Sequence, residues 1–268
     1  MKTNIAKWLL AILVTGSVIA ACSTVPITGR KQMNLLPESQ MMSMSLTQYQ
    51  QFLKDNPVSK DQERTEMVKN VGNRIAGAVE DYFEQNGMSN RIKNFEWEFN
   101  LIDDDTPNAW CMPGGKVVVY TGILPFTKDE TGLAVVMGHE IAHAVARHGN
   151  ERMSQELSVQ LGGAALSAAL DEKPEQTQNI FMAAYGLGSQ VAYKLPYSRT
   201  HESEADQLGL IFMAMAGYNP REAVEFWQRM SEQGGQKPPE FLSTHPSDQT
   251  RVKKLREFMP EAMKYYNK

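Results

Sequence analysis

Cysteine is scarce in this chain, since Cys22 and Cys111 are the only two among 268 residues. A disulfide framework of the kind that staples small secreted domains is therefore excluded, and the fold must depend on packing or on a metal ion. Positive charge is not in excess either, because 27 Lys and Arg face 31 Asp and Glu, for a net charge of −4. With no basic stripe, nucleic acid is not an expected partner.

A long hydrophobic run is also missing. The best candidate, residues 8–21, is interrupted by small polar residues, whereas a membrane-spanning helix needs roughly 20 apolar residues. Two lysines precede it and small residues lead up to Cys22, which is typical of a secretion signal. We therefore expect residues 1–21 to be a signal peptide; an uncleaved membrane anchor is the alternative.

The sequence IAAC at residues 19–22 resembles the lipobox of bacterial lipoproteins, in which the cysteine is acylated and becomes the mature N-terminus. Each buried CH₂ contributes about 0.8 kcal/mol, so several acyl chains hold a protein firmly to a bilayer. Ser23, where other lipoproteins have Asp, resembles an outer-membrane sorting signal. We expect a bacterial periplasmic protein, lipid-anchored through Cys22 to the outer membrane, with residues 22–60 as an extended tether or wrapping segment.

Periodicity in the remaining residues predicts a mainly helical α+β fold with a small β-sheet. Strand signals are an apolar–polar alternation over residues 95–101 and a β-branched run at 117–119 that follows a Pro-Gly-Gly turn. Thr127 and Glu130 have the spacing of a capping box, which predicts a helix starting near Lys128. Further helices are predicted at 61–85, 198–217, 219–230 and within 241–259, and two closely packed helices, rather than a membrane hairpin, at 151–194.

The segment VVMGHEIAHAVARHG, residues 135–149, places ionisable side chains in an apolar helix. His139 and His143 are four residues apart, so they lie one above the other and can present ring nitrogens to one metal ion. Glu140 is turned about 100° around the helix and can reach a water molecule beside that ion without being a ligand. The HExxH motif therefore predicts a zinc site with a carboxylate base; an amphipathic helix with incidental or buried structural histidines is the alternative.

Catalytic zinc takes three protein ligands, so a carboxylate on another helix is expected as the third. In SRTHESEAD, residues 198–206, Glu202 and Asp206 are four apart on one helix face. Glu202 can then bind the metal while Asp206 accepts the ring N–H of a ligand histidine. Other carboxylates could serve as the third ligand instead: Glu151, Glu156 and Glu204.

Together, HExxH, S-R-x-x-E-x-x-A-D at 198–206 and T-H-P at 244–246 resemble the HtpX and CAAX-prenyl-protease family of gluzincin zinc metallopeptidases. The lipobox and VPITGRKQMNLL at 25–36 are similar to its LoiP-like branch of periplasmic lipoproteins. The resemblance implies a minimal gluzincin fold over residues 61–268. It also implies one zinc ion per chain, with Glu140 as the base, Asp206 in support, and three ligands: His139, His143 and Glu202. The segment NAWCMPGG departs from the family, which more often has Phe and Ala or Ser.

A further donor is needed for the oxyanion that forms during peptide hydrolysis. His245 is the main candidate, with His201 and Tyr197 behind it. The family resemblance gives His245 another role, as a fourth zinc ligand that keeps the enzyme latent. A surface histidine that caps the last helix is the structural alternative.

Residues 107–110, PNAW, resemble the edge strand that pairs with extended substrate in gluzincins, which makes Asn108 and Ala109 candidate substrate-binding residues. An ordinary strand end is the alternative. Cys111 is expected to be a small core residue rather than a nucleophile, because no activating base is evident nearby. Arg199 and Arg251 could each pair with Asp206 or Glu202.

These features favour a zinc endopeptidase that acts on misfolded or unassembled envelope proteins. A chaperone-like or scaffolding lipoprotein, with a latent zinc site and a cleft that only binds unfolded strands, is the competing hypothesis.

Overall fold

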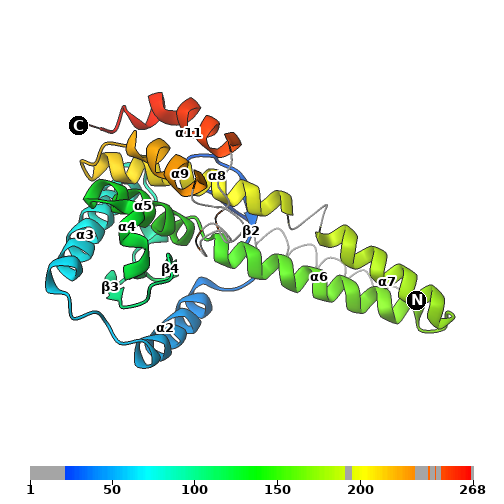
Figure 1. Ribbon diagram of the computed structural model, residues 1–268. Helices are drawn as coiled ribbons and strands as arrows, with labels where there is room; N and C mark the ends of the chain where they lie inside the picture. Colours follow the sequence, from blue (N-terminus) through cyan, green and yellow to red (C-terminus); the bar gives the residue numbers. More distant parts are fainter. Residues whose placement is uncertain (1–21, 191–194, 233–240, 242–244, 246–248, 267–268) are drawn as a thin grey trace. The chain divides into compact units, whose positions relative to one another are not determined.

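The structure is a computed structural model that describes residues 22–190, 195–232, 241, 245 and 249–266. The expected signal peptide lies outside the described residues. The chain divides into two compact units, one formed by residues 1–41 and 147–199 and the other by residues 42–146 and 200–268. Figure 1 shows the predicted mainly helical fold with small sheets, and the prediction is confirmed.

A three-stranded sheet organises the second unit. Its strands are β3 (Glu98–Ile102), β4 (Ala109–Met112) and β5 (Lys116–Tyr120), in the order β3-β5-β4. β3 runs parallel to β5, and β4 is antiparallel to it. The predicted turn before β5 is confirmed: Gly114 and Gly115 have φ of 94° and 86°, values that glycine adopts without steric cost.

One face of this sheet is covered by α2 (Glu38–Asp55), from which Tyr49 and Phe52 pack against Trp110 of β4. The Tyr49 hydroxyl also accepts a hydrogen bond from the Asn100 side chain at 2.5 Å. The expectation of an extended segment over residues 22–60 is therefore wrong for α2. Burying these rings against the sheet stabilises a helix whose polar, Met- and Gln-rich sequence gives little periodicity.

α3 (Gln62–Gln85) and α5 (Glu130–Val145) cover the opposite face. α3 begins as predicted, with the Asp61 side chain accepting a hydrogen bond from Arg64 N. It approaches β3 closely at Gly72, where an added Cβ would lie 2.4 Å from the Phe99 ring. The apolar residues of α3 at helical spacing are thus buried against the sheet.

The N-terminus of α5 differs from the predicted capping box. Asp129 is the N-cap, and its carboxylate accepts hydrogen bonds from Thr131 N and Gly132 N. Thr127 instead ends the short helix α4 (Leu124–Thr127), where its hydroxyl donates to Leu124 O. An ionised carboxylate is the stronger acceptor at the positive end of a helix, which explains why Asp129 takes the capping position.

Three further described helices belong wholly or mainly to this unit: α8 (Leu195–Met215), of which residues 200–215 lie in it, α9 (Glu222–Glu232) and α11 (Gln249–Ala262). Two single turns, η1 (Ser89–Arg91) and η2 (Thr121–Ile123), flank the sheet strands. α8 crosses α5 where two glycines meet, since an added Cβ on Gly209 would lie 3.0 Å from His139 N and one on Gly138 would lie 3.1 Å from Gly209 O. The missing side chains bring the backbones of α5 and α8 together beside His139.

The first unit contains a hairpin of strands, β1 (Cys22–Thr24) and β2 (Lys31–Met33), and a pair of helices, α6 (His148–Leu170) and α7 (Glu175–Ser189). α6 and α7 pack side by side, as predicted, and the Tyr185 hydroxyl donates to Val159 O at 2.9 Å. Among the described residues, no helix has both the length and the hydropathy needed to cross a membrane.

Candidate metal centre

The two motif histidines meet on the buried helix α5, as their spacing predicts. Their Nε2 atoms are 3.1 Å apart, and His139 is only 2% exposed. α5 is apolar and buried on nearly all sides, so its two imidazoles are held with little freedom to rotate away.

Glu202 of α8 completes a triangle of ligand atoms with the two histidines. Its carboxylate oxygens lie 3.3 Å from His139 Nε2 and 3.3 Å from His143 Nε2. Nitrogen and oxygen ligands about 2.0–2.1 Å from a tetrahedral zinc ion are ~3.3 Å from one another. The observed separations therefore match the edges of a zinc coordination tetrahedron.

His245 reaches the same point from the segment that precedes α11. Its Nδ1 is 3.1 Å from His139 Nε2 and 3.0 Å from a Glu202 oxygen, while its Nε2 is 3.3 Å from Glu140 Oε1. Four side chains thus place ligand atoms within 4.8 Å of one another: His139, His143, Glu202 and His245. His245 occupies the position of a fourth ligand and also touches the expected base.

Asp206 and Arg251 support this group from behind. Asp206 Oδ1 lies 3.0 Å from His139 Nδ1, on the side of the ring away from the other ligands. Arg251 donates to both oxygens of Asp206, at 2.8 and 2.6 Å, and approaches Glu202 to 3.3 Å. The expected Arg251 pairing is confirmed, whereas Arg199 is exposed and belongs to the other unit.

Trp227 of α9 was not identified from the sequence. The Arg251 guanidinium lies 3.3 Å from the centre of its ring, and the His139 ring meets it edge-on at 5.6 Å. A tryptophan on an amphipathic helix is an ordinary core residue by pattern, so only its neighbours in space reveal that it supports the site.

The surroundings of Glu202 and Asp206 favour the ionised form of both carboxylates. Burial raises the pKa of Glu202, but hydrogen bonds from the three imidazoles, His139 first, hold it far below its usual value. Burial also raises the pKa of Asp206, and the charge of Arg251 and the bond to His139 lower it further than burial raises it. Both carboxylates are therefore ionised.

The pKa of His139 responds in the opposite direction. Burial and the Arg251 charge lower it, and the hydrogen bonds to Asp206 and Glu202 raise it above the usual 6.5. Without a metal ion, a proton on this ring compensates the two carboxylates. A divalent cation between the ligand atoms would compensate the same two carboxylates with twice the charge. The donor set of three imidazoles and one carboxylate is typical of zinc.

The other sequence candidates for the third ligand lie elsewhere. Glu151 accepts two hydrogen bonds from the Arg30 guanidinium, at 2.8 and 2.7 Å, within the first unit. Glu156 is exposed, and Glu204 is buried but is not a member of the four-residue group. His201 is buried outside the group, and the Tyr197 side chain lies outside what the structure describes.

β4 is an edge strand and packs on α5. Tyr120 N donates to Asn108 O, so the backbone of Asn108 faces β5, and alternation along an antiparallel pair turns the backbone groups of Ala109 and Cys111 to the open edge. The Asn108 side chain accepts from Ala109 N at 2.9 Å. The backbone N–H of Ala109 thus lies at the open edge of the sheet, where the Asn108 side chain accepts from it.

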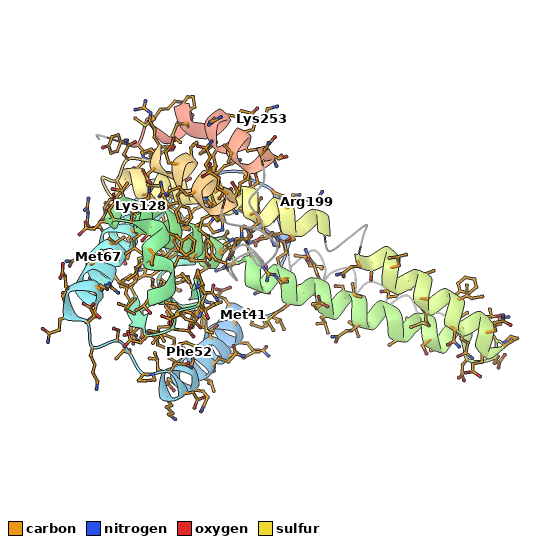
Figure 2. All side chains as sticks on the ribbon, in the orientation of Figure 1. Met41, Phe52, Met67, Lys128, Arg199 and Lys253 are labelled. Carbon is orange, nitrogen blue, oxygen red and sulfur yellow. The ribbon has the colours of Figure 1, made fainter. Side chains whose placement is uncertain are left out.

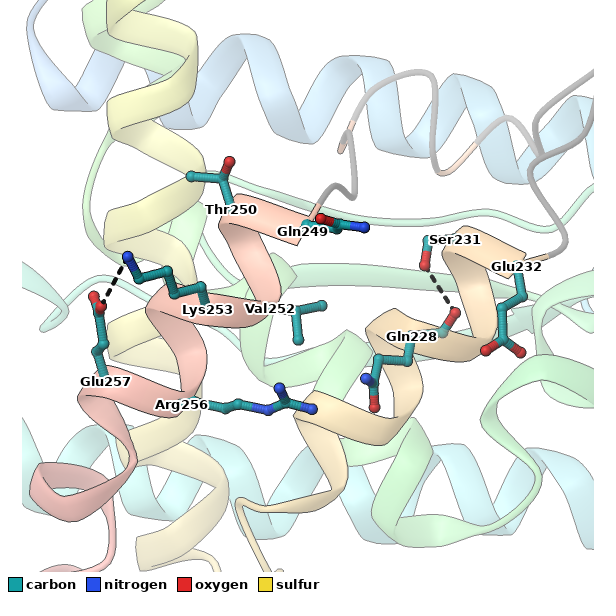
Figure 3. Close-up of a pocket in the computed structure, with 9 residues that line it drawn as sticks. All are labelled: Gln228, Ser231, Glu232, Gln249, Thr250, Val252, Lys253, Arg256 and Glu257. Atoms are coloured by element: carbon teal, nitrogen blue, oxygen red, sulfur yellow. Dashed lines mark hydrogen bonds and ion pairs between the residues drawn. The ribbon is translucent and has the colours of Figure 1, made fainter.

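Cys111 is partly buried on the α5 side of the sheet. Burial and the Glu140 charge raise the pKa of its thiol well above the usual value, which keeps the sulfur protonated and a poor nucleophile. A separate surface pocket of about 970 Å³ lies between α9 and α11 (Figure 3). It is lined by exposed polar chains such as Lys253 and Glu257, which pair at 3.8 Å, and by none of the four ligand-type residues.

Fold and site together define a helical metalloprotease built around an HExxH helix. The sequence pattern of peptidase family M48 matches residues 62–259, and the chain belongs to this family. The predicted family resemblance and the predicted enzyme class are therefore confirmed.

Three relatives illustrate the range of similarity. Mitochondrial metalloendopeptidase OMA1 of Schizosaccharomyces pombe is 34% identical over 264 residues, which cover 96% of this chain and 73% of that protein. The human metalloendopeptidase OMA1 is 32% identical over 89% of this chain and 46% of that protein. The β-barrel assembly-enhancing protease of Escherichia coli is 27% identical over 94% of this chain and 51% of that protein. The chain spans about half the length of the last two proteins.

Proposed function

We propose that this chain is a zinc-dependent endopeptidase, tethered to the bacterial outer membrane in the periplasm through acylated Cys22. We further propose that it hydrolyses peptide bonds in misfolded or unassembled envelope proteins. The catalytic domain comprises residues 61–268, preceded by the signal peptide, residues 1–21, and the segment 22–60. The observation that carries the proposal is the convergence of His139, His143 and Glu202 at tetrahedral ligand distances beside Glu140.

In this proposal one zinc ion is held by His139, His143 and Glu202. When bound, zinc lowers the pKa of a water molecule and polarises the scissile carbonyl. Glu140 takes a proton from the attacking water and returns it to the leaving amine nitrogen. Asp206 holds His139 with its Nε2 lone pair toward the ligand cluster, and Arg251 fixes Asp206.

Substrate would bind as an extended strand along β4. The outward backbone groups of Ala109 and Cys111 offer main-chain hydrogen bonds, which recognise a peptide with little regard for its side chains. Asn108 would release Ala109 N when a substrate carbonyl takes its place. This tolerance suits substrates that have in common only an unfolded backbone.

The location rests on the IAAC lipobox and the bilayer affinity of acyl chains. Relatives from both mitochondria and bacteria match the chain, and one of the bacterial relatives is a β-barrel assembly-enhancing protease. Detection of [³H]palmitate in the wild-type protein, but not in Cys22→Ala, tests the anchor.

Glu140→Gln tests the activity. The amide cannot accept a proton, so we expect full zinc content and loss of casein cleavage by a factor of at least 100. Glu130→Gln, on the same helix but exposed, serves as the control and should retain wild-type turnover. Near wild-type cleavage by Glu140→Gln would remove the proposed mechanism.

The position of His245 favours a second candidate, a chaperone-like lipoprotein with a latent zinc site. If His245 were a permanent fourth ligand, it would exclude the water molecule that attacks the substrate. If His245 can move away, catalysis is possible and its ring can donate to the oxyanion. If His245 holds the enzyme latent, His245→Ala lowers zinc affinity and raises casein cleavage. If it stabilises the oxyanion, the same variant retains zinc and loses cleavage. An inactive wild-type protein that still suppresses aggregation of unfolded proteins would favour the chaperone function.

A further inference from the structure

The α6–α7 pair of the first unit carries exposed apolar stripes. Among the described residues, six of the nine large apolar side chains that are exposed lie on these two helices: Met153, Leu157, Leu161, Ile180, Phe181 and Leu187. On α6 they recur every four residues and continue as exposed alanines, and on α7 Ile180 and Leu187 are seven apart. Figure 2 shows side chains projecting along the length of both helices.

These stripes are not the surfaces by which the two helices pack together. α6 faces α7 through Gly162, where an added Cβ would lie close to the Tyr185 hydroxyl. Leu161 is 61% exposed, Ile180 62% and Leu187 68%. The helices therefore pack Tyr185 of α7 over Gly162 and Gly163 of α6 and leave other large apolar side chains exposed.

Charge is confined to the two ends of this hairpin. No Asp, Glu, Lys or Arg occurs between residues 157 and 170 or between 176 and 190, whereas the connecting turn contains Asp171, Glu172, Lys173 and Glu175. A partner helix is normally specified by charged residues that flank an apolar stripe. The stripes here are flanked by Gln, Ser, Ala and Gly, which neither select nor repel a protein partner.

The segment that follows Cys22 is fixed to the base of α6. Arg30 forms a two-point ion pair with Glu151, which is 1% exposed. Leu35 N donates to Ser154 Oγ at 2.8 Å, and Asn150 donates to Leu36 O at 2.8 Å. The expected tether is thus part of the same unit as the hairpin.

The register of β1 and β2 brings the predicted acylation site to the apolar part of α6. Cys22 pairs with Met33, and the Met33 sulfur lies 4.0 Å from Ser158 Oγ. Ser158 lies at the start of the charge-free stretch, between Leu157 and Leu161. Acyl chains on Cys22 would therefore enter the bilayer beside the exposed stripes.

We propose that the exposed apolar stripes of α6 and α7 lie in the interface of the lipid bilayer next to the acyl anchor, as a second membrane contact. This inference rests on the lipid anchor of the proposed function. We expect these stripes to contact the bilayer rather than a second copy of this chain, because the acyl anchor keeps them at a high effective concentration of lipid. Because residues 157–170 and 176–190 contain no charged side chain, the contact along them is apolar and is insensitive to salt and to anionic lipid.

Site-specific fluorescence in vesicles tests the contact. The full chain is expressed so that Cys22 is acylated, with Cys111→Ala and a single new cysteine, Ile180→Cys or Leu187→Cys, for a fluorescent label. Leu46→Cys on α2, which is 41% exposed in the other unit, is the matched control. In phosphatidylcholine vesicles that contain nitroxide-labelled acyl chains, we expect at least twofold stronger quenching at 180 and 187 than at 46, unchanged in 1 M NaCl.

Each alternative gives a different result. Equal quenching at all three positions while the protein stays on the vesicles overturns the inference and leaves the anchor intact. Disulfide cross-linking of two chains through position 187, without quenching, assigns the stripes to a second copy instead. Release of wild-type protein from the vesicles on washing contradicts the anchor itself, and casein cleavage measured in parallel shows whether the proposed protease activity stands.

A second variant measures the strength of the contact. In Leu161→Gln/Ile180→Gln/Phe181→Gln/Leu187→Gln, the exposed positions should tolerate the change, so casein cleavage is retained and transfer from donor to acceptor vesicles becomes at least tenfold faster. Leu46→Gln/Val58→Gln, at positions of the other unit that are 41% and 47% exposed, should transfer at the wild-type rate. Equal rates for all three proteins would overturn the inference.

Discussion

The Asp206 carboxylate lies 3.0 Å from Nδ1 of His139, with the Arg251 guanidinium 2.6 Å from the same Asp206 oxygen. This relay fixes which ring nitrogen of His139 carries a proton and therefore which one can bind a metal ion. The three residues come from α8, α5 and α11, so the orientation of one ligand depends on three separate helices.

We expect Asp206→Asn to lower zinc affinity by a factor of about 10–100, because the neutral amide holds the His139 tautomer less firmly. Competition with a fluorescent chelator measures this. Asp81→Asn, at an exposed position of α3, is the control and should bind zinc as tightly as the wild type. Equal affinity of Asp206→Asn would show that the relay does not support the metal.

The glycine contact between α5 and α8 should be required for the site. The methyl group of Gly209→Ala would lie 3.0 Å from His139 N and would move the two helices apart by a few tenths of an ångström. Overpacking of this kind typically costs about 1–3 kcal/mol of unfolding free energy, and it would move Glu202 relative to the histidines. Urea unfolding and zinc titration measure the two effects.

Gly77→Ala is the matched control for that variant. Gly77 lies in α3 with nothing within 4 Å of an added Cβ, so the substitution should stabilise by about 0.5–1 kcal/mol and leave zinc affinity unchanged. If Gly209→Ala behaved like Gly77→Ala, the close crossing would have no role in placing Glu202.

Cys111 should be dispensable for catalysis. Its raised thiol pKa keeps it protonated, so we expect Cys111→Ala to retain casein cleavage within a factor of about two and iodoacetamide to react slowly at pH 7. Mass spectrometry of the labelled protein gives the alkylation rate. Loss of activity by a factor of 100 in Cys111→Ala would instead identify the thiol as a participant in the reaction.

Zinc affinity and metal-free stability should respond to pH in opposite directions. The pKa of His139 is raised above 6.5, so at a pH below this raised pKa a zinc ion must displace a proton from the ring. Zinc affinity then falls by about tenfold per pH unit of acidification. Without metal, the protonated ring contributes stability that is fully present below pH 6.5 and is lost as pH rises through the raised pKa. Zinc titrations and chelator-treated unfolding curves between pH 5.5 and 8.5, roughly the range of histidine titration, measure both.

Asp206→Asn provides the control for this pH dependence. Without the carboxylate that raises the His139 pKa, both pH profiles should shift to lower pH. Profiles that are unchanged in the variant would assign the titration to another group.

The HExxH helix α5 and the helix α8 that carries Glu202 were predictable, because residue spacing along each helix shows which side chains share a face. Residues 139 and 143 meet through helix geometry alone, and residues 202 and 206 share a face for the same reason. The helices that carry these residues, α5 and α8, were predicted, and the structure brings the four side chains of the metal centre together. Their roles in binding and catalysis stay predictions until they are measured.

The errors arose where tertiary contacts outweigh local pattern. α2 forms because Tyr49 and Phe52 pack against Trp110, which is about sixty positions later in the chain. The polar sequence of α2 gives no local signal for this contact. The capping box predicted at Thr127 does not form, because the Asp129 carboxylate accepts the first backbone N–H groups of α5. Trp227 became part of the site only through its position under Arg251.

Stoichiometric reconstitution with zinc tests whether peptide cleavage depends on one metal ion held by the proposed ligands. Chelator-treated protein is titrated with zinc at pH 7.5 while casein cleavage is followed, so that bound metal and activity are measured on the same sample. We predict no cleavage by the metal-free protein and a linear gain that saturates at one zinc ion per chain, with no gain in a His143→Ala variant. Full cleavage by the metal-free protein, or activity in His143→Ala at equal zinc occupancy, would show that cleavage does not depend on zinc bound by His143.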